Sequence, residues 1–183
     1  MRRVAIALVH HPVLDGRGVI VTSAITNLDV HDLARSARTF GVSDYFIVHP
    51  ITAQRDLVEK IQKHWAEGSS GKRIPARKDA LALVRPVASL ADARAALGGR
   101  EAIEMWTTSA VNDARVLAMS EARARCAQGE KPLLIVFGTA WGLAPEVHAA
   151  ADARLAPIVG RDAWNHLSVR SACAIYLDRL LAP

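Results

Sequence analysis

Four polar side chains follow one another at helical spacing early in the chain. Asn27, His31, Arg35 and Arg38 are three or four residues apart, so in a helix they lie on one face. Apolar residues of the same segment repeat with the same period and predict a buried face opposite to it. A guanidinium group can hold a phosphate in a fixed fork. This face could therefore hold a phosphate group, and the alternative is a solvated polar face.

A glycine-containing loop follows the most apolar strand of the sequence. The strand Leu133–Phe137 is followed by Gly138-Thr139-Ala140-Trp141-Gly142-Leu143, and a polar turn, Asn165–Arg170, leads into the last helix. Glycine has no Cβ, so the backbone N–H and C=O groups of such a loop can contact a small ligand. Together with the arginine-bearing helix, these loops indicate an enzyme that uses a cofactor and acts on RNA.

Two further groups of residues could take part in the chemistry. A basic cluster surrounds a glycine-serine loop and predicts contacts to the RNA backbone, with a solvated loop as the alternative; it consists of Lys72, Arg73, Arg77 and Lys78. His10 ends the first strand and could act as an acid or base near neutral pH, or it could be a structural histidine.

Strands and helices alternate along the chain, which predicts an α/β fold with a mostly parallel sheet and helices on both faces. Ligands of such sheets bind beyond the carboxyl ends of the strands. We expect residues 1–183 to form one domain. Strands are expected at Val4–Val9, Tyr45–Val48, Leu81–Val87, Ala102–Thr107, Leu133–Phe137 and Arg154–Ile158. Helices are expected at Asn27–Phe40, Thr52–Ala66, from Ser89 to Gly98, at Asn112–Cys126, Pro145–Ala150 and Val169–Leu181, with a flexible loop at Gly68–Arg73.

The composition and the absence of common motifs argue against several functional classes of protein. The chain has a net charge of +5, which suits a polyanionic partner, and no apolar run near the roughly 18 residues of a membrane span. Cys126 and Cys173 have no metal-ligand spacing and are expected to be buried free thiols, as in a reducing cytoplasm. No GxGxxG, P-loop or GxSxG motif occurs, which argues against the usual nucleotide-binding α/β enzymes.

Three segments resemble, in order, the signature motifs of the SPOUT superfamily, the trefoil-knotted S-adenosylmethionine-dependent RNA methyltransferases. They are the helix Asn27–Gly41, the strand and loop Ile135–Leu143, and the turn and helix Asn165–Ala174. The pattern is most similar to a small stand-alone branch related to a domain that is fused to the bacterial tRNA guanine-N1 methyltransferase. The resemblance implies a deep C-terminal knot, a homodimer in the cytoplasm, S-adenosylmethionine as cofactor, tRNA or rRNA as substrate, and no metal or membrane.

The same resemblance implies roles for individual residues. The family's catalytic or RNA-orienting arginine falls on Arg35, and Asp29 is either the N-cap of its helix, which we favour, or a general base. His31 and Arg38 are expected to bind RNA with the basic cluster. The cofactor loops fall on Gly138, Thr139, Trp141, Gly142, Leu143, Pro157, Ile158, Asn165, Leu167, Ser168 and Val169, where Asn165 could also be a helix cap.

The chain departs from the family pattern in one cofactor loop. Many relatives carry a glutamate where this chain has Ala140, which leaves the general base open among Arg35, Asp29, His10 and His31. The third motif also fits a His…Arg pattern of the family's pseudouridine methyltransferases through His166 and Arg170, so the methylated atom is open. The alternative function is a catalytically inactive RNA-binding or partner module with the same fold. A less favoured alternative is an α/β enzyme that binds another nucleotide in the glycine loop.

Overall fold

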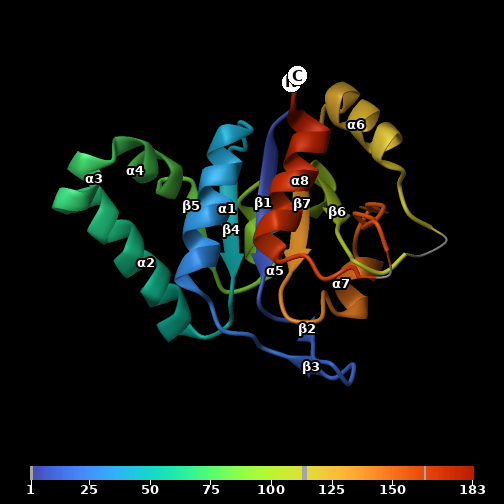
Figure 1. Cartoon of the computed structure of the whole chain (residues 1–183), viewed down its shortest axis with the longest axis horizontal. Coiled ribbons are helices and arrows are strands. Elements are labelled where there is room, and N and C mark those ends of the chain that lie inside the picture. The colour runs from blue at the N-terminus through green and yellow to red at the C-terminus, as the bar shows by residue number, and fades with distance from the viewer. Residues whose placement is uncertain (1, 113–114, 163) are drawn as a thin grey trace.

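The computed structural model describes residues 2–112, 115–162 and 164–183 and is built around a six-stranded parallel sheet (Figure 1). The strand order is β5-β4-β1-β7-β6-β8, so the first strand lies in the middle beside the apolar strand of the glycine loop. The strands are β1 (Val4–Val9), β4 (Asp44–Val48), β5 (Val84–Val87), β6 (Glu104–Thr107), β7 (Leu133–Gly138) and β8 (Ala153–Arg154).

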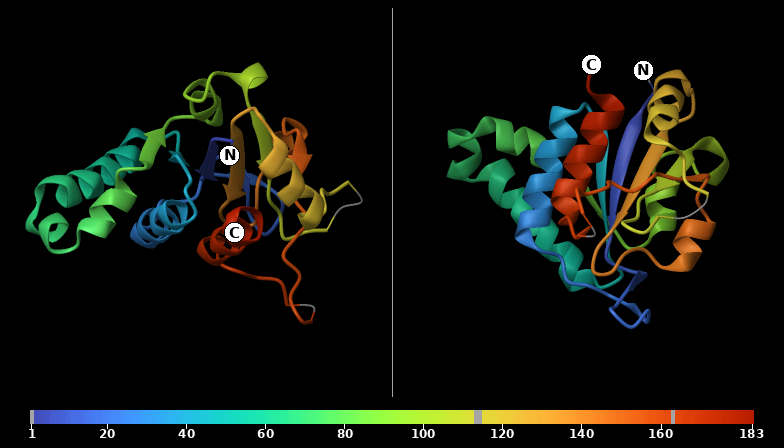
Figure 2. Two further views of the ribbon diagram at one scale, coloured as in Figure 1. Left: turned by 90° about the horizontal axis from the view of Figure 1, so that it is seen from above. Right: turned by 45° about the vertical axis from the view of Figure 1, so that its right-hand side comes forward.

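Both faces of the sheet are covered by helices, as predicted. Alternate residues of β1 point to opposite cores: Val4, Ile6 and Leu8 to one, and Ala5, Ala7 and Val9 to the other. The first face carries α1 (Asn27–Thr39), α2 (Thr52–Glu67), α4 (Pro75–Leu81), α6 (Met119–Gln128) and α8 (Val169–Leu181). The second carries α5 (Leu90–Ala95) and α7 (Pro145–Ala149). Figure 2 shows α1 and α8 side by side on the first face, with α5 on the other.

Local capping explains where three helices begin. The Ser89 side chain and Asp92 form a reciprocal capping box at the start of α5, and the Ser168 hydroxyl accepts from the Ser171 amide at the start of α8. At α1 the Thr26 hydroxyl accepts from the Asp29 amide at 3.2 Å. The interpretations of Asp29 and Asn165 as helix caps are therefore wrong.

The arm formed by α2, α3 (Ser69–Arg73) and α4 was only partly predicted. Residues 68–73 were expected to be a flexible loop, but Ser69–Arg73 is a short helix, and α4 follows with Pro75 in its first turn. A Cβ on Gly71 would lie 1.9 Å from the Trp65 carbonyl oxygen, so this glycine permits close packing of α3 on α2. The strand expected from Leu81 begins three residues later, at β5, because Leu81 ends α4.

Two other expectations were wrong in their bounds. The helix expected from residue 112 begins at Met119, because Leu117 is extended: its amide donates to Arg154 O and its carbonyl accepts from the Ala156 amide. Residues 113–114 of that prediction lie outside the described residues. The strand expected at 154–158 is limited to β8 (Ala153–Arg154), and η1 (Arg100–Ala102) precedes β6.

An unpredicted hairpin, β2 (Val13–Leu14) with β3 (Ile20–Val21), lies beyond the carboxyl end of β1. The Leu14 amide donates to Gly142 O at 2.9 Å and Leu14 O accepts from the Trp141 amide, so the hairpin braces the glycine loop. Cys126 and Cys173 are buried free thiols, as predicted. In the part of the chain that the structure describes, no helix has both the length and the apolar character to span a membrane.

Candidate functional site

A pocket of about 680 Å³ opens at the carboxyl edge of the sheet, beside the end of β7 and the start of α8. The carboxyl ends of parallel strands meet at this edge, which is where the sequence predicted the ligand site. Four stretches of chain that are distant in sequence meet there. The pocket is lined by residues 23–24, 26, 29, 108–111, 137–142, 158, 165–170, 172 and 176.

Most of the residues predicted to bind the cofactor line this one pocket. They are Gly138, Thr139, Trp141, Gly142, Ile158, Asn165, Leu167, Ser168 and Val169. Leu143 does not line it: its side chain is buried in the core of the second sheet face. Pro157 does not line it either, although its neighbour Ile158 does.

The floor of the pocket is a tight turn that requires glycine. A Cβ on Gly138 would lie 2.7 Å from the Leu143 amide nitrogen and 2.9 Å from its Cγ, closer than real Cβ contacts. The turn is fixed because the Thr139 amide donates to Val9 O at 3.2 Å and the Gly142 amide to Thr139 O at 3.0 Å. Glycine at position 138 thus lets residues 142–143 fold back closely onto the end of β7.

A chain of hydroxyl groups joins the pocket wall to a buried histidine. The Thr139 hydroxyl donates to Val9 O at 3.1 Å and contacts the Ser23 hydroxyl, which lies 2.9 Å from His10 Nδ1. Because the Thr139 hydroxyl donates to Val9 O, the Ser23 hydroxyl donates to Thr139 and accepts from His10. The proton of the neutral imidazole is therefore on Nδ1. Among the described residues, His10 Nε2 has no hydrogen-bond partner. Burial, and then the neighbouring His49, lower the pKa of His10 to about 4, so the ring is neutral at pH 7.

His10 itself does not line the pocket, and only Ser23 and Thr139 of this chain of groups do. Its predicted role as an acid or base would therefore have to act through Ser23. The geometry makes His10 a residue that positions the Ser23 and Thr139 hydroxyls.

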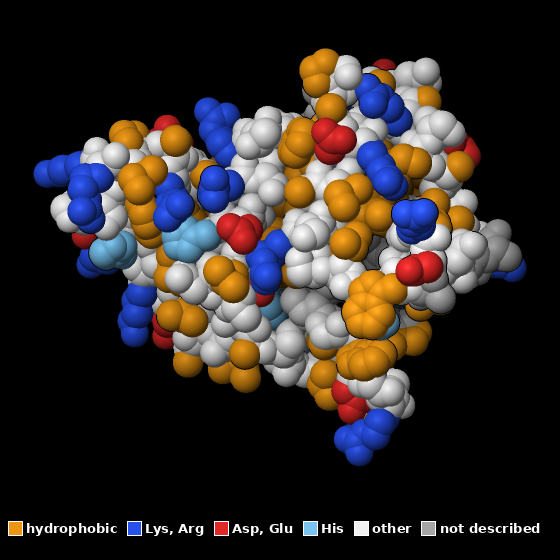
Figure 3. Space-filling view, in the orientation of Figure 1, with side chains coloured by type: hydrophobic (Ala, Val, Ile, Leu, Met, Phe, Trp, Pro, Cys, Tyr) orange, Lys and Arg blue, Asp and Glu red, His pale blue; other side chains and the backbone are white. Residues whose placement is uncertain are grey.

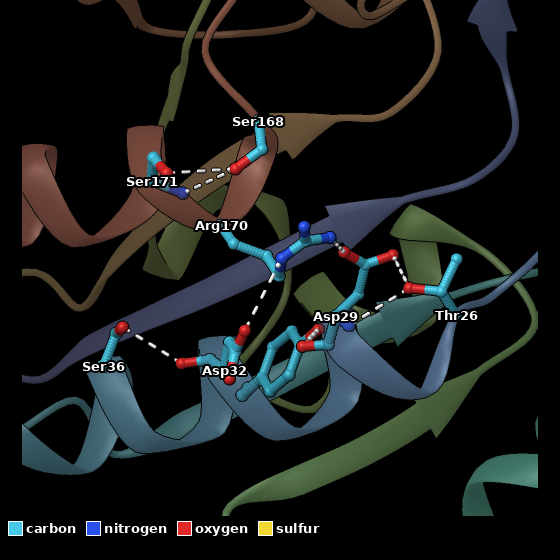
Figure 4. A network of polar contacts seen from close by, with 8 residues as sticks. Thr26, Asp29, Asp32, Ser36, Ser168, Arg170 and Ser171 are labelled. Atoms are coloured by element: carbon cyan, nitrogen blue, oxygen red, sulfur yellow. Dashed lines mark hydrogen bonds and ion pairs between the residues drawn. The ribbon is translucent and has the colours of Figure 1, made fainter.

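An ion pair forms the opposite wall, between α1 and α8 (Figure 4). Arg170 Nη1 lies 3.0 Å from Asp29 Oδ1, and its Nε lies 3.5 Å from Asp32 Oδ2. The second oxygen of Asp29 accepts from the Thr26 hydroxyl at 2.6 Å. Asp29 is nearly buried, and both Asp29 and Arg170 line the pocket. The carboxylate is thus fixed, by an ion pair and a hydrogen bond, at the edge of the cavity.

An aromatic rim that sequence reasoning largely missed lies at the pocket, where Trp141 and His166 line the cavity and Trp164 packs against His166. The Trp141 side chain is exposed, and its ring centroid lies 6.4 Å from that of His166, which in turn lies 4.9 Å from that of Trp164. Three aromatic residues within the two ligand loops are the sequence feature that could have indicated this rim.

The predicted RNA-binding helix face opens onto a different hollow. This α1–α2–α4 groove has a volume of about 600 Å³ and lies between those three helices. Arg35 and His31 line it together with Asn27, whereas Asp29 lies on the pocket side of α1. Of the predicted basic cluster only Arg77 lines this groove. The remaining predicted RNA-binding residues, Arg38, Lys72, Arg73 and Lys78, line neither hollow.

Comparison with known proteins places the chain among methyltransferases. Residues 3–182 match the model of a family described as "SAM-dependent RNA methyltransferase". The chain is 39% identical over 184 residues to a tRNA (guanine-N(1)-)-methyltransferase of Oleidesulfovibrio alaskensis, covering 98% of this chain but 42% of that protein, so it spans less than half of that relative. It is 37% identical to an uncharacterized protein of Aquifex aeolicus, covering 98% of this chain and 88% of that one.

The fold also resembles that of solved structures. A probable methyltransferase from Bordetella pertussis Tohama I superposes with a TM-score of 0.65 at 16% identity, covering 98% of this chain and 94% of that one. At this identity the likeness concerns the fold alone.

Proposed function

The chain belongs to a family of S-adenosylmethionine-dependent RNA methyltransferases, and on this basis we propose that it transfers a methyl group from S-adenosylmethionine to a nucleotide of tRNA or rRNA. The observation that carries the proposal is the pocket at the carboxyl edge of the sheet. Four stretches of chain that are distant in sequence line this single cavity, and each of the three predicted cofactor loops contributes to it.

The pocket suits S-adenosylmethionine in both size and chemistry. Its volume of about 680 Å³ lies within the range of small-molecule sites. The turn that Gly138 allows brings residues 138–142 to the pocket, and Phe137, Ile158 and Leu167 provide apolar surface for a planar base. We propose that the cofactor is held by the predicted residues that line the pocket, with Leu143 and Pro157 supporting their loops. Once bound, the cofactor supplies an electrophilic methyl group.

We assign the acceptor side of the pocket to Asp29 and Arg170. The carboxylate of Asp29 is fixed by Arg170 and Thr26, so it can accept a proton from an acceptor hydroxyl or N–H group placed at the cavity edge. Arg35 lies on the groove side of the same helix, which suits contact with the target nucleotide's phosphate better than contact with the reacting atoms. Positioning of the acceptor against the methyl group would supply much of the rate enhancement.

We further propose that residues 1–183 form one SPOUT domain with a deep C-terminal trefoil knot, that two copies pair as a homodimer, and that the protein works in the cytoplasm. The knot is supported by the course of the chain, since α8 packs against α1 and β7 after the two ligand loops. The cytoplasmic location is supported by the two unpaired thiols, Cys126 and Cys173.

Methyl transfer from radiolabelled S-adenosylmethionine to total bacterial tRNA, and separately to rRNA, tests the proposed activity. Asp29→Asn is expected to lower transfer by about 100-fold or more while cofactor binding persists, since general-base catalysis contributes at least that much. Arg35→Ala is expected to reduce transfer by weakening RNA binding and to leave cofactor binding intact. Cofactor binding by the wild type without transfer to either RNA would favour the catalytically inactive module instead.

A further inference from the structure

The α1–α2–α4 groove is a second hollow on the same face as the pocket, and it has no role in holding the cofactor. The residues that line it include His31, Asp32 and Arg35 of α1, Lys60 and Trp65 of α2, and Arg77 of α4. Figure 3 shows Lys, Arg and His side chains gathered over this part of the molecule, formed by α1, α2 and α4.

The groove has an excess of positive charge. Within the described residues, Arg35, Lys60 and Arg77 make no ion pair with a carboxylate. The one carboxylate that lines the groove, Asp32, is paired with Arg170. Burial, and then the nearby charge of Arg77, lower the pKa of His31, which is consistent with a local positive potential. The surface therefore favours an anionic occupant.

Trp65 fixes the position of one of these cations. The Arg77 guanidinium carbon lies 5.1 Å from the centroid of the Trp65 ring, at cation–π distance. The rings of His31 and His64 pack edge-on against the same indole at 5.5 and 6.0 Å between centroids. A guanidinium held in this way loses less side-chain entropy when it binds a phosphate.

The groove and the pocket are adjacent along α1. Arg170 bridges them, because it contacts Asp29 on the pocket side and Asp32 on the groove side (Figure 4). A strand of nucleic acid that lies in the groove can therefore reach the pocket across the first two turns of α1.

We propose that the α1–α2–α4 groove binds the sugar–phosphate backbone of the RNA substrate next to the target nucleotide, with Lys60, Arg77 and Arg35 as phosphate ligands and Trp65 as the platform that orients Arg77. This inference rests on the proposed RNA methyltransferase function and adds the RNA path to it.

Two lysines of α2 provide a matched test. Lys60 lines the groove, whereas Lys63, three residues away on the same helix, is exposed and lies outside it. Binding of total bacterial tRNA to the protein saturated with S-adenosylmethionine is measured by filter binding for the wild type, Lys60→Glu and Lys63→Glu. Lys60→Glu is expected to weaken binding by roughly 10-fold or more and Lys63→Glu by much less. Arg77→Gln is expected to reduce the slope of log affinity against log salt by about 0.7, as for one lost phosphate contact to a single strand.

Calorimetric titration with S-adenosylmethionine and sedimentation velocity accompany each variant. Cofactor affinity and oligomeric state should equal those of the wild type. Equal RNA affinities for Lys60→Glu and Lys63→Glu, with the wild type binding RNA, would overturn the groove proposal and leave the proposed function standing. A change of oligomeric state in Lys60→Glu alone would identify the groove as an interface between copies and also overturn it. A wild type that binds neither tRNA nor rRNA would contradict the proposed function itself.

Discussion

Acid should destabilise this protein partly through one buried histidine beside the pocket wall. The His10 side chain is fully buried, its Nδ1 lies 2.9 Å from the Ser23 hydroxyl, and its ring centroid lies 5.6 Å from that of His49. The folded protein therefore holds the imidazole neutral, and the pKa of His10 falls from 6.5 to about 4. The nearby Asp29 carboxylate acts in the opposite direction but is the weaker effect.

The size and the pH range of the effect follow from this lowered pKa. As the pH falls below 6.5 the unfolded chain takes up a proton on this imidazole, whereas the folded chain does not until the pH nears 4. The free energy of unfolding therefore decreases through this window as the pH is lowered. Linkage gives a loss of about 3 kcal/mol in full, of which about 2 kcal/mol occurs between pH 7 and pH 5.

Urea unfolding of the wild type and His10→Asn at pH 7 and pH 5 measures this contribution. Asparagine keeps a polar atom near the Ser23 hydroxyl and cannot titrate, so the variant should lose about 2 kcal/mol less than the wild type between the two pH values. His64→Asn, at an exposed histidine of α2, controls for the loss of a histidine as such. Equal pH dependence in the wild type and His10→Asn would show that burial does not hold this ring neutral.

Three further substitutions examine the walls and mouth of the pocket. Thr26→Val removes the N-cap of α1 and should lower the free energy of unfolding by about 1 kcal/mol in urea titrations. Arg170→Met leaves the Asp29 carboxylate without its cation, so it should destabilise the fold by about 1 kcal/mol and reduce methyl transfer more than cofactor affinity; unchanged transfer would exclude the assigned acceptor role. Trp141→Ala removes an exposed ring at the pocket mouth, and calorimetry should show cofactor affinity reduced by about 10-fold with thermal stability unchanged.

The sheet was predictable from sequence because its strands are buried on both faces. The predicted bounds of β1 and α8 agree with the structure, since an apolar run marks the strand and an apolar period marks the helix, although the cap of α8 is Ser168 and not Asn165. The helix α2 was predicted to within one residue, but α3 and α4 were not predicted. The role of Gly71 depends on its contact with the Trp65 carbonyl, which local composition does not reveal.

The part of the site that consists of loops was predictable from sequence. The part on α1 was less so, because the direction of each side chain depends on its angle around the helix axis. Asp29 and Arg35 were both predicted near the reacting atoms from one motif. They are six residues apart, which separates their directions by about 120° around the helix axis. Asp29 therefore lies in the pocket and Arg35 in the groove. The Asp29–Arg170 ion pair joins residues 141 positions apart, and the pairing of Trp65 with Arg77 likewise depends on how two helices meet.

The central claim is that the glycine turn after β7 forms the floor of an S-adenosylmethionine site. Calorimetric titration of the wild type and Gly138→Ala with S-adenosylmethionine tests it most directly, with circular dichroism to confirm that the variant is folded. A Cβ at this position would lie 2.7 Å from the Leu143 amide nitrogen, so the turn must shift if alanine is introduced. We expect binding to the wild type that the folded variant has lost or greatly weakened. Equal affinity in the two proteins would place the cofactor away from this turn.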